Sequence, residues 1–205
     1  MSTTQPPIPA GLVRSLEQTS APRVVLIRHA DRPELPPGDS GVKVPLTRQG
    51  EARARGLGER LGGELEWART SPLRRCVDTA RLVGVEPSPT DLLGAPGPFV
   101  VHRRRGGSVF GEHGTRAVVR AYVKGETWGI MRPVSEGVRL VLDDLLPRMD
   151  RGGSGLAVTH DAIAIPIIAW VTGHDFSEDW LDPLDGAVLT SAGLTWRGTL
   201  YRWSS

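Results

Sequence analysis

"VVLIRHADRP", residues 24–33, joins four consecutive apolar residues to a group of charged ones. The β-branched run over residues 23–27 is typical of a strand buried on both faces of a parallel or mixed sheet. Arg28, His29, Asp31 and Arg32 follow it within five positions. Because ligands of open α/β sheets bind beyond the carboxyl ends of the strands, we expect these side chains to form part of a site.

Two later segments end in the same way. "EWARTSP", residues 66–72, predicts a second strand, and Arg74 and Arg75 follow it. "GLAVTH", residues 155–160, predicts a third strand, and Asp161 comes directly after it. These three strand ends are the places where we expect the chemistry to lie.

Helical segments separate the predicted strands. Thr47 is a good N-cap for a helix that stops at Gly62-Gly63. Further helices are predicted at residues 73–84, at 134–149 with Ser135 as its cap, and at 161–173, and the alternating tail 186–203 predicts terminal strands. This alternation predicts an α/β protein, a three-layer α/β/α sandwich with a mostly parallel central sheet flanked by helices.

The length of 205 residues is that of one domain, which can bury roughly 70% of its unfolded surface. Residues 1–22 are rich in Pro, Ser and Thr and show no clear period, so we expect a flexible N-terminal arm ahead of a single domain over residues 23–205. Residues 98–102 are a candidate strand. Residues 103–133 are Gly-rich and basic, and we expect them to be irregular.

The composition excludes several classes of protein. The single cysteine, Cys76, rules out an internal disulfide, and no apolar run reaches transmembrane length. The first residues lack the pattern of a secretory signal, so we expect a cytoplasmic protein with no membrane partner. The formal net charge of +2 is too small to argue for a nucleic-acid partner. No metal and no cofactor are predicted.

Four motifs, in this order, resemble the histidine phosphatase superfamily, whose fold is that of the phosphoglycerate mutases. They are "LIRHADRP" (26–33), "LTRQGEARARGLGERL" (46–61), "TSPLRRCVDTARLV" (70–83) and "LAVTHDAIAI" (156–165). Any one of them is weak, but four in order are specific. The resemblance spans roughly residues 23–172.

The resemblance implies a role for each matching residue. His29 matches the nucleophile that becomes phosphorylated. Three residues match the pocket that holds the phosphate: Arg28, Arg75 and His160. Arg32, followed by proline, matches the extra arginine of the acid-phosphatase branch. Asp161 matches the aspartate that in that branch donates a proton to the leaving group.

Two departures bear on the type of enzyme. Ala30 replaces the usual glycine of the first motif, which is a small change. Gly94, in "TDLLGAP", stands where the mutase-like branch has its acid. The second departure weakens a mutase interpretation and moves the proton-donor role to Asp161.

The chemistry of these residue types agrees with the resemblance. A neutral imidazole is a nucleophile at pH 7 because its free pKa is about 6.5. A phosphoryl group in transfer carries charge on three oxygens, and guanidinium groups pair well with such oxygens without a metal. Asp161 could protonate the leaving oxygen and then activate water, provided that its pKa is raised.

The resemblance also implies a substrate-covering insert near residues 94–133. Arg103 and Trp128 lie in this region and are candidate substrate contacts. The run Arg103–Arg105 has a simpler interpretation, because a charge run is usually a solvated loop.

We therefore expect a metal-independent phosphatase that hydrolyses a phosphate monoester of a small metabolite through a phosphohistidine on His29. Two alternatives stay open: a phosphoglycerate mutase-like phosphotransferase, and a non-catalytic phospholigand-binding or regulatory protein of the same fold. A metal-dependent phosphohydrolase would need His and Asp at ligand spacing on helices. A nucleic-acid binder resting on Arg103–Arg105 would bind polyanions with a steep salt dependence. Neither the substrate nor the oligomeric state is predicted.

Overall fold

The structure is a computed structural model that describes residues 7–34, 41 and 43–203. These residues form one seven-stranded sheet with the strand order β3-β2-β4-β1-β5-β6-β7. Its parallel half consists of β1 (Val24–Arg28), β2 (Leu65–Thr70), β3 (Pro87–Pro89) and β4 (Ser154–Thr159). The antiparallel half follows through β5 (Gly186–Thr190), β6 (Gly193–Trp196) and β7 (Thr199–Arg202).

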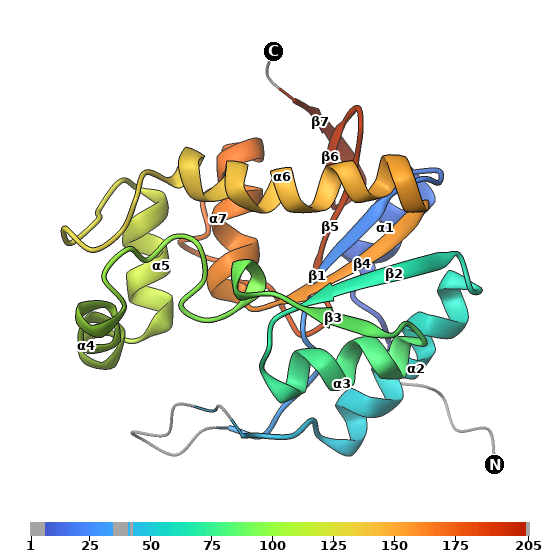
Figure 1. The fold of residues 1–205 in the computed structure, drawn as a ribbon, viewed down its shortest axis with the longest axis horizontal. Coiled ribbons are helices and arrows are strands. Elements are labelled where there is room, and N and C mark those ends of the chain that lie inside the picture. The colour runs from blue at the N-terminus through green and yellow to red at the C-terminus, as the bar shows by residue number, and fades with distance from the viewer. Residues whose placement is uncertain (1–6, 35–40, 42, 204–205) are drawn as a thin grey trace.

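Helices cover both faces of the sheet (Figure 1). One face carries α1 (Ala10–Glu17), α2 (Arg48–Leu61) and α3 (Arg74–Val83). The other carries α6 (Val134–Gly152) and α7 (Asp161–Thr172), and α5 (Thr115–Val123) packs on α7 beside the sheet. The 3₁₀ turn η1 (Asp91–Leu93) and α4 (Arg103–His113) lie in the connection from β3 to α5. The predicted three-layer α/β/α sandwich is confirmed.

Strand β1 is central because both of its faces are buried. Val24 and Leu26 belong to the core under α5, α6 and α7, while Val25 and Ile27 belong to the core under α1, α2 and α3. All four side chains are fully buried, and burial of each is worth about 1.5–3 kcal/mol. The continuous apolar run thus places the end of β1 in the middle of the molecule.

The expectation of a flexible arm over residues 1–22 is wrong where helix α1 forms. Leu12, Ser15 and Leu16 recur at helical spacing and are buried, so this helix has an apolar face to pack. Residues 1–6 lie outside the described residues. Helix α1 contacts β5, so it belongs to the folded body.

Two expectations for residues 98–133 are also corrected. The segment expected to be irregular contains α4 and α5, and α5 packs on α7 through Val118, Val119 and Tyr122, which are buried. The candidate strand at 98–102 makes only one bridge, between Val100 and Met131. Helix α4 is hard to see in the sequence because it contains three glycines and few apolar residues.

Other boundaries follow the prediction more closely. The Thr47 hydroxyl accepts a hydrogen bond from the Gly50 amide at 3.0 Å, and Gly62 ends α2 in the left-handed conformation. Helix α6 begins after Pro133 rather than at a Ser135 cap.

Within the described part of the chain, none of the helices has the length and hydropathy to span a bilayer.

Candidate active site

The carboxyl ends of β1, β2 and β4 bring the three polar motifs together. The His29 amide donates to the Thr159 carbonyl, and the Ser71 amide donates to the Val158 carbonyl, both at 2.9 Å. The sheet's hydrogen bonding therefore continues past the strand ends. The imidazole rings of His29 and His160 lie 5.3 Å apart, centre to centre, in an edge-on arrangement.

The loop after β1 is held by both neighbouring helices. Thr79 of α3 accepts a hydrogen bond from the Ala30 amide at 3.1 Å. The Asp31 carboxylate forms an ion pair with Arg53 of α2 at 2.8 Å. A Cβ at Gly50 would run into the backbone of Asp31, so only glycine lets α2 approach this loop so closely. These contacts fix the backbone that carries His29.

The hydrogen bonding of His29 determines its tautomer. The ring is 3% exposed, and its Nδ1 lies 2.7 Å from the Ala30 carbonyl oxygen. A carbonyl can only accept, so Nδ1 carries the hydrogen and Nε2 of the neutral ring keeps its lone pair. Burial, aided by the charges of Arg75 and Arg28, lowers the pKa of His29 to about 3. At neutral pH the ring is therefore uncharged and nucleophilic at Nε2.

His160 is also neutral, in the opposite tautomer. Its Nδ1 lies 3.3 Å from Nη2 of Arg75, and its Nε2 lies 2.9 Å from the Ser71 hydroxyl. A guanidinium only donates, so Nδ1 accepts and the Nε2 hydrogen points to Ser71. Burial, with the Arg75 charge, lowers the pKa of His160 well below its usual value. In this structure His160 holds Arg75.

Two arginines at this edge have unsatisfied donors. Arg75 donates to the Gly41 carbonyl at 2.6 Å, and Arg28 donates to the Leu181 carbonyl at 2.5 Å. In the part of the chain that the structure describes, the Nε atoms of Arg28 and Arg75 are buried without a hydrogen-bond partner. An unsatisfied buried donor costs about 1–3 kcal/mol, so an oxyanion that accepted from these groups would gain that energy.

Asp161 opens helix α7 and is an ionised carboxylate. Its Oδ1 accepts from the Ala162 amide at 2.9 Å, and its Oδ2 accepts from the indole of Trp180 at 2.9 Å and lies 3.3 Å from Nη2 of Arg28. Burial raises the pKa of Asp161. Arg28, Trp180 and the Ala162 amide together lower it by more than burial raises it, so the net pKa lies below its usual value. Asp161 therefore lacks, in the ligand-free site, the raised pKa that it needs to act as an acid.

The site carries excess positive charge. Arg32, at the rim, donates to the Pro33 carbonyl at 2.8 Å, and the charges of Arg28 and Asp161 act on it. The guanidinium groups of Arg28, Arg32 and Arg75 face one carboxylate, Asp161, while both imidazoles are neutral. Such a site suits a doubly charged anion such as a phosphate monoester.

Arg103 and Trp128, the two candidates from the insert, lie elsewhere. Arg103 is largely exposed and pairs with Asp91 at 3.7 Å. Trp128 stacks on His113, with ring centres 6.2 Å apart. Among the described contacts, none joins either residue to His29. Their role in substrate binding stays a prediction.

Residues 90–96, in which Gly94 stands where the mutase-like branch has its acid, run beside the site. A Cβ at Gly94 would lie 3.4 Å from Pro72, and the carbonyl of the preceding Leu93 accepts from the Thr159 hydroxyl at 2.7 Å. The nearest acid in sequence, Asp91, is 77% exposed and pairs with Arg103 instead. This leaves Asp161 as the carboxylate that lies against Arg28.

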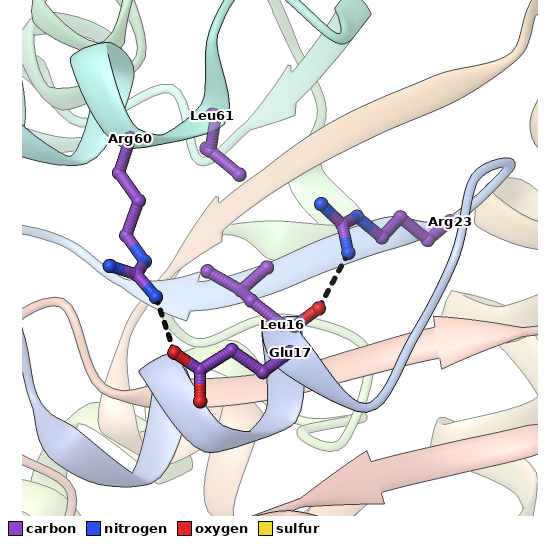
Figure 2. A pocket seen from close by; sticks show the side chains of 5 residues that line it. All are labelled: Leu16, Glu17, Arg23, Arg60 and Leu61. Carbon is purple, nitrogen blue, oxygen red and sulfur yellow. Dashed lines mark hydrogen bonds and ion pairs between the residues drawn. The ribbon is translucent and has the colours of Figure 1, made fainter.

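A cavity of about 260 Å³ lies away from this site, between α1 and the end of α2. Figure 2 shows Arg60 pairing with Glu17 and Arg23 donating to the Leu16 carbonyl. Arg23 precedes β1, so this cavity is near the start of the strand that carries His29 at its end. Its arginines are paired, and Arg23 serves to cap the carboxyl end of α1.

Sequence reasoning missed Trp180. This residue lies in the connection between α7 and β5, within no motif, and only the fold brings it to Asp161. The backbone acceptors Gly41 and Leu181 carry no side-chain signal either. In the residues that the structure covers, no three His, Cys, Asp or Glu side chains are grouped as metal ligands would be.

Residues 24–92 match the family model of the histidine phosphatase superfamily (branch 1). This segment includes the first three motifs and ends before His160. None of the curated protein sequences matches the chain.

Solved structures of this fold resemble the chain over most of its length. Rv3214 of Mycobacterium tuberculosis is 20% identical with a TM-score of 0.51, over 88% of this chain and 97% of that one. The protein histidine phosphatase SixA, solved with tungstate, is 18% identical with a TM-score of 0.53, over 85% and 93%. A phosphoglycerate mutase of Bacillus anthracis is 14% identical with a TM-score of 0.56, over 91% and 94%. At such identities the likeness shows the fold alone.

Proposed function

We propose that the chain is a metal-independent phosphatase acting on a phosphate monoester, because residues 24–92 match the model of the histidine phosphatase superfamily, whose members are phosphatases or mutases. The observation that carries this proposal is His29: a buried, neutral imidazole with Nε2 unprotonated, beside two arginines with unsatisfied buried donors. Such a group is a ready nucleophile next to an anion site.

In the proposed first step, Nε2 of His29 attacks phosphorus and the bond from phosphorus to the leaving oxygen breaks. Arg28 and Arg75 hold the phosphoryl oxygens, whose charge is spread over three atoms in the transition state. Asp161 gives its proton to the leaving oxygen. Asp161 takes up this proton from solvent when the substrate dianion binds, because a like charge beside the carboxyl raises its pKa.

In the second step, water attacks the phosphohistidine, Asp161 takes a proton from that water, and the bond from phosphorus to Nε2 breaks. His29 returns to the neutral form, and inorganic phosphate leaves. The ionised state of Asp161 in the free site suits this half of the reaction.

We propose a small phosphorylated molecule as the substrate. The two histidines are only 3% and 4% exposed, so a slender phosphate ester reaches them more easily than a folded protein surface. The mutase alternative lacks an acid at Gly94, where the mutase-like branch has one.

The test is release of phosphate from an aryl phosphate in excess chelator, by wild type and His29→Ala side by side, with thermal unfolding of both. We expect activity that survives the chelator and falls by at least about 10⁴-fold in the variant, since a covalent nucleophile is removed. Equal activity in both proteins would refute the mechanism. Activity lost in chelator would support the metal-dependent alternative, and a folded but inactive wild type would support a binding protein.

A further inference from the structure

We propose that Trp180 is a positioning residue for Asp161: its indole N–H holds Oδ2 of the carboxylate, and two arginines of α5 hold the indole in place. This inference rests on the proposed function, in which Asp161 is the acid and base. It assigns a role to a residue that lies outside every motif.

The geometry links three elements. The indole Nε1 lies 2.9 Å from Oδ2 of Asp161, at the start of α7. The guanidinium carbons of Arg116 and Arg120 lie 5.4 and 5.6 Å from the indole centre, within cation–π range. Arg120 is itself fixed, because its Nε donates to the Phe176 carbonyl at 2.9 Å.

Trp180 donates this hydrogen bond and Asp161 accepts it. An indole N–H only donates, so Oδ2 must accept from it whether Asp161 is ionised or protonated. The half-buried Trp180 could have directed this hydrogen to solvent, yet it points to a carboxylate that already faces Arg28. The bond therefore fixes the orientation of the carboxyl group and favours its ionised form.

The charged groups around Asp161 determine how the loss of this hydrogen bond changes the pKa of the carboxyl. Arg28 lies against it from β1, and the charges of Arg32 and Arg75 act on it from the loop after β1 and from α3, while the nearby His29 ring is neutral. All of these stay in place when Trp180 becomes Phe, which keeps an aromatic ring but loses the N–H. The change then raises the pKa of Asp161, because the ionised carboxylate loses one hydrogen bond.

Trp196 offers a matched control. Its indole Nε1 is buried without a partner in the described residues, and Arg197 lies over its ring at 4.3 Å. Trp196→Phe is thus the same chemical change without a lost hydrogen bond.

The experiment compares the pH dependence of kcat, which reports the enzyme–substrate complex, for an alkyl phosphate in wild type, Trp180→Phe and Trp196→Phe. The basic limb, where Asp161 loses its proton, should move to higher pH by about 0.4–1 unit in Trp180→Phe alone. An aryl phosphate, which needs no acid, should show no such displacement. Superimposable alkyl-phosphate profiles for all three proteins would overturn the inference, whereas inactivity of wild type would instead refute the proposed function.

A second measurement depends neither on the folding of a Trp180 variant nor on enzyme activity. In the ¹⁵N–¹H spectrum of wild type, the Trp180 indole resonance should titrate with the Asp161 carboxyl, and this titration should vanish in Asp161→Asn. The Trp196 resonance should be unaffected. A Trp180 indole signal at the same position in wild type and in Asp161→Asn would contradict the inference.

Discussion

At the scale of single residues, Asp161 has to change its charge during the proposed reaction. Without substrate, Arg28 and Trp180 keep it ionised, although burial acts in the opposite direction. A bound phosphate dianion would compete for Arg28 and add negative charge nearby, and both effects raise the pKa of the carboxyl. The substrate itself would thus create the acid that its leaving group needs.

Replacement of Asp161 by Asn tests this role. We expect kcat for an alkyl phosphate to fall by about 10²–10⁴-fold, and kcat for an activated aryl phosphate by far less, because a good leaving group needs no proton. The measurement is steady-state hydrolysis of both substrates. Equal losses for both would mean that Asp161 supports folding or binding rather than proton transfer.

The residue scale is also where the sequence was most informative. Its motifs place His29, His160, Arg28 and Arg75 at strand ends, and the fold brings these side chains to one edge of the sheet. The protonation pattern was out of reach, because it depends on acceptors such as the Ala30 carbonyl that have no side-chain signature. The ionised state of Asp161 was out of reach for the same reason, since Trp180 is 19 residues away.

At the scale of elements, the position of α2 against the loop after β1 depends on Gly50. A Cβ there would collide with the Asp31 backbone, so Gly50→Ala must push the helix or the loop away. We expect a loss of about 1–3 kcal/mol in unfolding free energy and a large loss of activity, because the loop carries His29. Urea unfolding and aryl phosphate hydrolysis measure the two effects.

Gly111 of α4 provides the control for that prediction. It is also a helical glycine, but a Cβ there meets nothing within 4 Å. Gly111→Ala should therefore stabilise the protein by about 0.4–1 kcal/mol and leave hydrolysis unchanged. If both variants behaved alike, the close approach of α2 would not be the reason for glycine at position 50.

The elements that sequence reasoning missed share a physical cause. Helix α1 begins after prolines and is only eight residues long, and its burial depends on a sheet face that appears much later in the chain. Helix α4 contains three glycines and buries only Gly106. The short length of α1 and the glycines of α4 make each helix marginal in isolation, so tertiary packing decides their structure.

At the scale of the whole molecule, the site lies where the two cores meet at the end of the sheet. Cores on both faces exclude water from His29 and His160, which is why both rings are neutral. The same burial that prepares the nucleophile also lowers the stability of the protein in acid. Stability and reactivity are therefore linked through the two histidines.

This link predicts how stability depends on pH. The pKa of His29 is about 3 in the folded protein against about 6.5 in an unfolded chain, and the pKa of His160 is lowered too. Between these values the unfolded chain binds more protons, so the unfolding free energy falls as pH drops below about 6.5. Each unit of pKa difference corresponds to about 1.4 kcal/mol, so the loss between pH 7 and pH 5 should be readily measurable.

Urea unfolding at pH 7, 6 and 5 measures this loss, in a window where most carboxylates remain ionised. The double variant His29→Gln/His160→Gln should show a much flatter profile than wild type over this window. His102→Gln, at an exposed position, controls for the removal of a histidine as such and should keep the wild-type slope. A wild-type free energy that is constant from pH 7 to pH 5 would mean that the two rings accept protons in the folded protein, and that His29 is not held as a neutral nucleophile.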